Sequence, residues 1–249
     1  MLVVFEHFKV FPFADNLLSG TIGVDIFYII SGFIMSINIE KYIDRQRDAI
    51  DVGANIGFQT VLMSKIISNR KVLAIEPTRN ALIRLRRNLK LNAAEKNVII
   101  FDGVASDVNE TTSIKVLEGR EEYSTLGVVS HPSVVGDSGS FTTERVQART
   151  LDQLADDFNL DVGFIKVDAE GHEHKIFDGA KVLLTTQRPI VISELSDTLL
   201  RKNGSSALAV IRYFEALDYV VSDPLNAKAT PGLRQFGDIV CVPSERQQS

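Results

Sequence analysis

Two segments of the sequence carry the side chains best suited to chemistry. The first, from Ala49 to Thr60, reads AIDVGANIGFQT, an apolar strand pattern that leads through a glycine loop into a helix. Ligands of open α/β sheets bind at the carboxyl ends of the strands, where such a loop stands. A cofactor could approach the backbone closely at a glycine, and a carboxylate could meet an ammonium group. We therefore expect a cofactor site formed by Asp51, Gly53, Ala54, Asn55 and Gly57.

The spacing of the two glycines favours one class of cofactor. Gly53 and Gly57 stand in a G-x-x-x-G pattern, whereas dinucleotide-binding loops use G-x-G-x-x-G, whose second glycine admits a pyrophosphate. A cofactor without a pyrophosphate therefore fits better, and a nicotinamide-dependent oxidoreductase is the less favoured alternative. Gly57 is expected to let helix and strand pack tightly. Glu76 ends the next apolar strand, where an acid can hydrogen-bond ribose hydroxyls.

The second segment, FIKVDAEGHEHKIF from Phe164 to Phe177, places acids and an imidazole directly after a buried strand. Such groups beside a cofactor can orient a hydroxyl and accept its proton, so the candidate catalytic residues are Asp168, Glu170 and His172. Asp168 is the favoured base and is also expected to border the cofactor, whereas His172 could equally be a helix cap or a packing residue. A metal site from the same three residues is a less favoured alternative. Glu173 and His174 are expected on the surface, in the first turn of the following helix.

Alternating strands and helices must position these residues. Apolar runs and helical periodicity predict the alternation, with strands at 49–52, 71–75, 97–101, 163–167 and 189–193. The helices are expected from 56 or 57 to 66 and at 79–91, 151–158, 172–184 and 205–217. This order predicts a doubly wound, mostly parallel α/β sheet with helices on both faces. Two closing strands at 219–221 and 238–242 have no helix between them, so they predict a terminal antiparallel hairpin.

A polar segment, from Glu110 to Arg149, interrupts the alternation and is rich in Ser, Thr and Gly. It has the pattern of an inserted hairpin or flap that shapes an acceptor pocket, with Tyr123, Ser124 and His131 as candidate pocket residues. The net charge of −5 argues against a nucleic-acid partner, because phosphate binding needs a basic face. A single cysteine, Cys241, excludes an internal disulfide framework and indicates a reducing compartment.

The first part of the chain has a different composition. Residues 20–39 are almost wholly apolar. The length of this stretch matches the ~20 residues that span a bilayer as a helix. We expect an apolar helical segment at 1–40, a charged linker at 41–48 and a catalytic domain at 49–249. Membrane contact through 20–39 is favoured over a buried appendage. Lys41, Arg45 and Arg47 would then mark the cytoplasmic side and place the domain at the inner face of the membrane.

The motifs beyond residue 49 together resemble the FkbM methyltransferase family, over about residues 49–243. The resemblance rests on IDVGANIGFQT, IEPTRNALIRLRRNL, RTLDQL, FIKVDAEGHEHKIFDGA and PIVISEL. It implies a Rossmann-like class I methyltransferase fold, S-adenosylmethionine as cofactor, and methylation of a hydroxyl on a small molecule or sugar. The family's cofactor loop corresponds to Asp51, Gly53, Asn55 and Gly57, its ribose carboxylate to Glu76, and its fourth-strand acid to Asp168, followed by Glu170 and His172.

Residues 1–37 resemble instead the start of the integral-membrane acyltransferases that O-acylate sugars. The similarity rests on GTIGVDIFYIISGFIMS and the preceding VVFEHFKVFPF, in which His7 matches the histidine associated with acyl transfer. The family's remaining membrane helices do not follow, so we expect no acylation. Because this segment stands where methyltransferases have their own leader, a membrane-tethered remnant that binds the cofactor without turnover is an alternative function.

Overall fold

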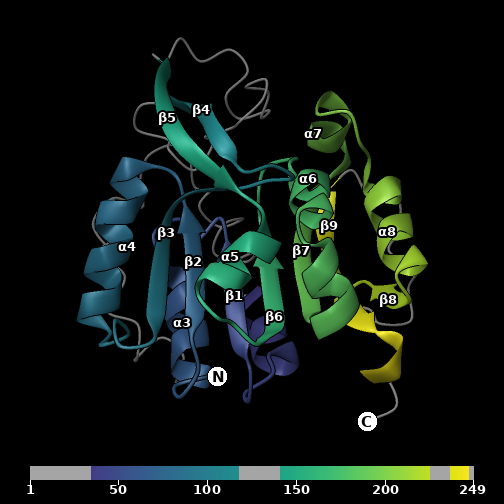
Figure 1. The fold of residues 1–249 in the computed structure, drawn as a ribbon, viewed down its shortest axis with the longest axis horizontal. Coiled ribbons are helices and arrows are strands. Elements are labelled where there is room, and N and C mark those ends of the chain that lie inside the picture. The colour runs from purple at the N-terminus through teal and green to yellow at the C-terminus, as the bar shows by residue number, and fades with distance from the viewer. Residues whose placement is uncertain (1–34, 118–140, 225–235, 247–249) are drawn as a thin grey trace, which may run out of the picture.

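The computed structural model describes residues 35–117, 141–224 and 236–246. In these residues nine strands form one mixed sheet in the order β4-β5-β3-β2-β1-β6-β7-β9-β8 (Figure 1). The strands are β1 (Asp48–Val52), β2 (Val72–Glu76), β3 (Val98–Ala105), β4 (Glu110–Leu117), β5 (Phe141–Arg149), β6 (Val162–Val167), β7 (Ile190–Ser196), β8 (Tyr219–Ser222) and β9 (Phe236–Pro243). In the order of the sheet, the strands from β5 to β7 pair in parallel, whereas β4 and β9 are antiparallel to their neighbours.

Helices cover both faces of the sheet, as the alternation predicts. The labelled helices are α3 (Phe58–Ile66), α4 (Arg79–Leu91), α5 (Leu151–Asp157), α6 (Glu173–Asp178), α7 (Asp197–Lys202) and α8 (Ala207–Ala216). Successive strand residues point to opposite faces, so Ile50 packs with the side chains of α5, α6 and α8, and Ala49 packs with those of α3 on the other side. Leu82, Leu85 and Leu89 of α4 are buried with α3. This is the predicted doubly wound architecture.

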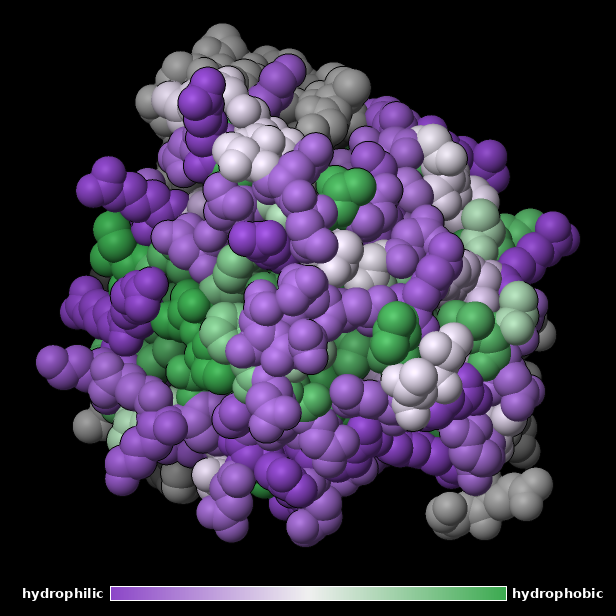
Figure 2. Space-filling view, viewed as in Figure 1, coloured by the Kyte–Doolittle hydropathy of each residue, from purple (hydrophilic) through white to green (hydrophobic). Residues whose placement is uncertain are grey.

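The polar insertion contains the expected hairpin, because β4 pairs antiparallel with β5 from Glu110 to Leu117. The end of β5 pairs in parallel with β3, so the hairpin extends the sheet at one edge. It takes the place in the chain where another helix would follow β3. Ile99 and Phe101 of β3 are therefore only partly buried, and apolar residues reach the surface between α4 and α5 (Figure 2). Tyr123, Ser124 and His131 lie outside the described residues.

Two predicted elements differ in their details. The terminal antiparallel hairpin is present, but β9 lies between β7 and β8, and only β8 is at the edge. The helix expected at 172–184 is interrupted: α6 ends at Asp178, with Gly179 as its C-cap, and a π-helical turn follows at Leu183–Gln187. A Cβ on Gly179 would lie 2.0 Å from the carbonyl oxygen of Ser106, so the end of α6 packs directly on the backbone that follows β3.

The domain core begins before the predicted linker. Residues 35–42 are helical, and Met35, Ile39 and Ile43 are buried in one cluster with Phe164 of β6. Within 41–48, the guanidinium of Arg47 donates to Asp161 at 2.8 Å. The described end of the apolar stretch therefore packs against the sheet, and residues 41–48 are bound to the domain. In the described part of the chain, no helix has the length and apolar character needed to cross a membrane. Residues 1–34, His7 among them, lie outside it.

Candidate functional site

The predicted site residues meet at the carboxyl ends of three adjacent strands, β2, β1 and β6. The backbone N–H of Asn55, in the glycine turn, donates to Oε2 of Glu76 at 2.9 Å. On the other side, the N–H of Asp168 donates to the carbonyl of Val52 at 3.2 Å. The expected convergence of the turn, Glu76 and Asp168 is therefore present in the structure.

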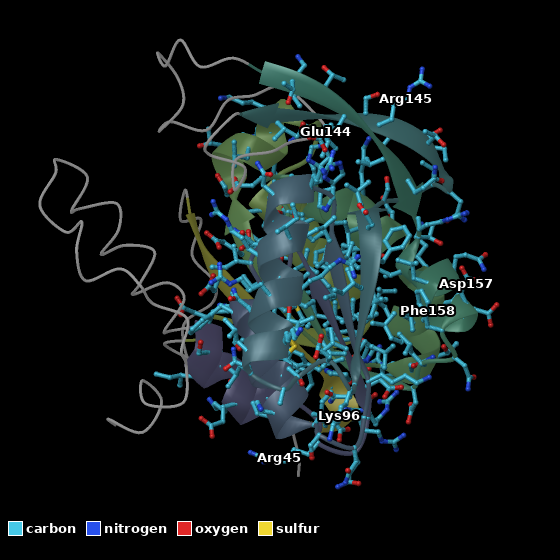
Figure 3. The ribbon with its side chains drawn as sticks, turned by 90° about the vertical axis from the view of Figure 1, so that its left-hand side faces the viewer. Arg45, Lys96, Glu144, Arg145, Asp157 and Phe158 are labelled. Atoms are coloured by element: carbon cyan, nitrogen blue, oxygen red, sulfur yellow. The ribbon has the colours of Figure 1, made fainter. Side chains whose placement is uncertain are left out.

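The β4–β5 hairpin stands at the same end of the molecule. In Figure 3, Glu144 and Arg145 of β5 lie at one end, whereas Arg45 and Lys96, which precede β1 and β3, lie at the other. Parallel strands that begin near Arg45 and Lys96 must end toward the hairpin. Figure 1 agrees, because α6 and α7, which follow β6 and β7, also lie at the hairpin's end. The hairpin thus lies at the same end of the molecule as the site, and its role in an acceptor pocket stays a prediction.

Glu76 is held rigidly by its own neighbours. Oε1 accepts hydrogen bonds from the backbone N–H of Thr78 at 2.9 Å and from its hydroxyl at 2.6 Å. Among the described residues, Oε2 accepts from Asn55 alone, which leaves a second lone pair on that oxygen for a further donor. Burial raises the pKa of Glu76, and the hydrogen bonds from Thr78 and Asn55 oppose that rise. The carboxyl is thus a fixed acceptor at the end of β2.

Both glycines allow a close contact with another part of the chain. Gly53 has φ +72°, and a Cβ there would lie 2.0 Å from the carbonyl oxygen of Asp168. The space that we expected to be open to a cofactor is therefore filled by the backbone after β6. Gly57 has φ +88°, and its Cβ would lie 2.3 Å from Cδ1 of Leu85. Its close packing is against α4, not against the strand as predicted.

The N–H groups of the turn are bonded within the protein. Those of Gly53 and Ala54 both donate to the carbonyl of Ile75, at 3.1 and 3.0 Å, and that of Gly57 donates to Ala54 at 2.8 Å. Asn55, with φ +49°, directs its N–H to Glu76. Phosphate-binding loops aim such donors at the ligand. The bonding of this turn therefore agrees with the prediction of a cofactor without a pyrophosphate.

Asp51 lies beneath the turn and is fully buried. Oδ2 accepts a hydrogen bond from the hydroxyl of Thr60 at 2.6 Å, and Oδ1 lies 3.2 Å from the ammonium nitrogen of Lys166. The carboxylate does meet an ammonium group, but it is that of a lysine in the protein. A direct contact of Asp51 with a cofactor stays a prediction.

The turn after β6 presents Asp168, whose side chain is 40% exposed. The chain reverses sharply here, with positive φ at Glu170 (+49°) and Gly171 (+93°). This reversal directs Glu173 inward: it is buried, and its Oε1 accepts from the N–H groups of Ala169 and Gly171 at 3.2 and 3.1 Å. The prediction that Glu173 is a surface residue was therefore wrong. Its carboxyl braces the turn that carries the candidate acids.

The imidazole of His172 is buried beside this turn. Burial, followed by the nearby Lys175 and His174, lowers its pKa to about 4, so the ring is uncharged at neutral pH. His172 occupies the N-cap position of α6, but its side chain makes no capping hydrogen bond. Packing is therefore the role that its position supports best. His174, expected on the surface, is partly buried.

Sequence reasoning missed three ionisable residues. Lys166 is buried on β6, two residues before Asp168. Glu194 of β7 and Asp238 of β9 lie opposite each other in the antiparallel pairing of these two strands. Burial and then the charge of Asp168 raise the pKa of Glu194 to about 10 and that of Asp238 to about 6. The sequence did indicate Glu194, because it is an acid near the end of the predicted fifth strand. Glu76 and Asp168 have the same position on their own strands.

The edge of the sheet thus offers fixed hydrogen-bond acceptors and an excess of acidic groups. Such groups suit hydroxyls and cationic ligands. Within residues 35–117, 141–224 and 236–246, no three His, Cys, Asp or Glu side chains are grouped so that they could hold a metal ion. A metal site from Asp168, Glu170 and His172 is therefore not formed in this structure.

Comparison with known proteins identifies one family. The model described as "Methyltransferase FkbM domain" matches residues 51–221. The match begins after the first 37 residues, whose resemblance to membrane acyltransferases stays a prediction. No curated protein matches the chain.

Several solved structures resemble this fold. An FkbM methyltransferase from Methylobacillus flagellatus is 19% identical with a TM-score of 0.48, over 78% of this chain and 43% of its own. The precorrin-6y C5,15-methyltransferase of Geobacter metallireducens is 14% identical with a TM-score of 0.47, over 93% of each chain. A putative O-methyltransferase of Klebsiella pneumoniae is 12% identical with a TM-score of 0.45, over 86% of this chain and 80% of its own. The chain therefore spans less than half the length of the Methylobacillus protein.

Proposed function

Because the chain belongs to the FkbM methyltransferase family and has a class I methyltransferase-like α/β fold, we propose that it transfers a methyl group from S-adenosylmethionine to a hydroxyl oxygen. The acceptor is a small molecule or a sugar. The observation that carries the proposal is the meeting of Glu76, the glycine turn and Asp168 at one edge of the sheet. A cofactor held by the first two would lie beside the third.

The chemistry of this edge fits S-adenosylmethionine. Glu76 keeps a lone pair on Oε2 for a ribose hydroxyl, in a carboxyl whose position Thr78 and Asn55 fix. The excess of carboxyl groups suits a ligand that carries a sulfonium and an ammonium. A dinucleotide fits less well, because the N–H groups of Gly53 and Ala54, which could bind a phosphate, both donate to Ile75. These contacts support the methyl donor over a nicotinamide cofactor.

In this proposal, the residues of the chain act by positioning and by proton transfer. S-adenosylmethionine would supply an activated methyl group when bound, because the positively charged sulfur leaves as a neutral thioether when the methyl is transferred. Holding two reactants in line can lower the activation barrier by roughly 7–11 kcal/mol. Asp168 is partly exposed and accepts the hydrogen bond, and then the proton, of the acceptor hydroxyl. The rigid turn after β6, braced by Glu173, sets the place of that carboxylate.

The proposal is tested in two stages on the full chain. Calorimetric titration with S-adenosylmethionine and with NAD⁺ measures which cofactor binds, and we expect binding of the first alone. Transfer of a radiolabelled methyl group to a panel of sugars, lipid-linked sugars and small hydroxyl compounds then identifies the acceptor. Absence of S-adenosylmethionine binding would overturn the proposal. Binding without transfer to any acceptor would instead favour a non-catalytic remnant.

A further inference from the structure

Lys166 is an unusual residue for its position in the sheet. It lies on β6, between β1 and β7, and only 3% of it is exposed. Its neighbours along the strand, Ile165 and Val167, are buried in the apolar core. Central parallel strands are covered on both faces and are normally continuous apolar runs. A charged side chain there needs compensating partners, because an unpaired buried ammonium is strongly unfavourable.

The partners of Lys166 come from both sides of the candidate site. Its Nζ donates to the carbonyl oxygens of Gly53 at 2.9 Å and of Val52 at 3.3 Å. The same nitrogen lies 3.2 Å from Oδ1 of Asp51 and 3.8 Å from Oδ2 of Asp168. Asp51 is the residue of β1 that stands opposite Lys166 in the sheet. One ammonium therefore contacts the strand and turn expected to hold the cofactor and the acid expected to hold the acceptor.

The side chain is charged in this environment. Burial acts to lower the pKa of Lys166, but the nearby carboxylates of Asp51 and Asp168 outweigh it and raise the pKa above its ordinary value. Charge-assisted hydrogen bonds are shorter and about twice as strong as neutral ones. Those to Gly53 and Val52 therefore restrain the turn more firmly than an apolar residue at 166 would.

We propose that Lys166 is a positioning residue that ties the glycine turn after β1 to Asp168 after β6. It fixes the distance between the cofactor and the group that takes the acceptor's proton. Gly53 complements this contact, because its missing Cβ lets the backbone of Asp168 pack directly against the turn. The part of this inference that concerns cofactor and acceptor rests on the proposed function. The tether itself is a property of the chain without ligand.

The rival explanation is that Lys166 only neutralises the buried carboxylate of Asp51. The two explanations differ in a double variant. Lys166→Met removes the ammonium but leaves Asp51 as a buried unpaired charge, which could by itself impair folding. Adding Asp51→Asn removes that charge, and the amide oxygen can still accept from Thr60. If Lys166 is a tether, the double variant folds but its turn stays loose. The carbonyl of Gly53 then loses the ammonium donor, and that of Val52 keeps the N–H of Asp168 without it.

The matched control is Lys71→Met. Lys71 precedes β2 at the opposite edge of the sheet, and its ammonium also donates to a backbone carbonyl, that of Phe158, at 2.9 Å. Amide hydrogen exchange of peptides that cover 52–57 is measured without cofactor. Calorimetry and methyl transfer are then measured with S-adenosylmethionine, the latter at saturating cofactor.

We expect exchange in 52–57 to be about tenfold or more faster in both Lys166→Met proteins, with cofactor affinity and kcat each reduced at least about tenfold. Lys71→Met should match the wild type in these measurements. If the double variant has wild-type exchange, affinity and kcat, the tether proposal is overturned. Lys166 would then only balance the charge of Asp51. Failure of the wild type to bind S-adenosylmethionine would remove the proposed function, and exchange in 52–57 would still decide whether Lys166 restrains the turn.

Discussion

Glu173 makes the stability of the domain depend on pH in a way that one substitution can isolate. Burial raises the pKa of its carboxyl from 4.5 to about 7, against the opposing hydrogen bonds from the backbone of the turn. Between these values the unfolded chain ionises Glu173, while the folded chain keeps the proton. The contribution of this group to stability is therefore fully present below pH 4.5, decreases as the pH rises, and is lost above about pH 7.

The size of this effect follows from the shift. At about 1.4 kcal/mol per unit, a rise in pKa from 4.5 to about 7 changes the free energy of unfolding by about 3 kcal/mol. Glu173→Gln keeps an oxygen to accept from Ala169 and Gly171 but cannot ionise. Its amide nitrogen takes the place of Oε2, which has no hydrogen-bond partner among the described residues. That unpaired group lowers stability by a constant amount, roughly 1–3 kcal/mol, at every pH.

The assay is urea unfolding at intervals from pH 4.5 to 8, with Glu95→Gln as a control for the loss of one exposed acid. Below pH 5 the wild type should be the more stable protein. The difference should then shift toward Glu173→Gln by about 3 kcal/mol as the pH reaches 8. Glu194 and Asp238 also have raised pKa values, but they are present in both proteins and cancel in the comparison. Parallel stability curves would refute the reasoning, because they would mean that Glu173 ionises alike in both states.

Three further substitutions test the site. Gly53→Val puts a Cβ 2.0 Å from the carbonyl oxygen of Asp168, at a residue whose φ is +72°. We therefore expect the melting temperature and the calorimetric affinity for S-adenosylmethionine both to fall. Normal values of both would mean that the turn can move aside. Glu76→Ala removes a fixed acceptor and should weaken that affinity about tenfold to a hundredfold in a folded protein, and unchanged affinity would exclude Glu76 from the site. Asp168→Asn keeps the shape of the turn and should lower kcat by roughly 10²–10⁴ with little change in cofactor affinity, whereas equal rates would exclude it as the base.

The arrangement of the site could be predicted because it follows from a general rule. Parallel strands end at the same edge of a sheet, so Glu76, Gly53 and Asp168 had to approach one another once their strands were recognised. The acidic end of each strand is visible in the local sequence. The role of Gly53 was less accessible, since the sequence does not show whether a ligand or another backbone occupies the space beside a glycine.

The burial of Glu173 was predicted wrongly and Lys166 was missed for a different reason, because their placement depends on geometry that has no local signature. The positive φ values at Glu170 and Gly171 reverse the chain and direct Glu173 inward, whereas helical periodicity alone put it on the surface. Lys166 finds its partner only through the register that sets it opposite Asp51 on β1. A sequence read in segments contains no information on register between strands so far apart.

The position of β9 affects how the chain can assemble during synthesis. β9 is the latest strand of the described chain to leave the ribosome, yet it lies between β7 and β8 and pairs with both. Until residues 236–243 emerge, the edge of β7 has no partner on that side, and β8 has no strand to join. Unpaired strand edges of this kind are where nascent chains associate wrongly with one another. A chain that ends before these residues would therefore be a nearly complete but open sheet, with the edge of β7 free to pair with another chain.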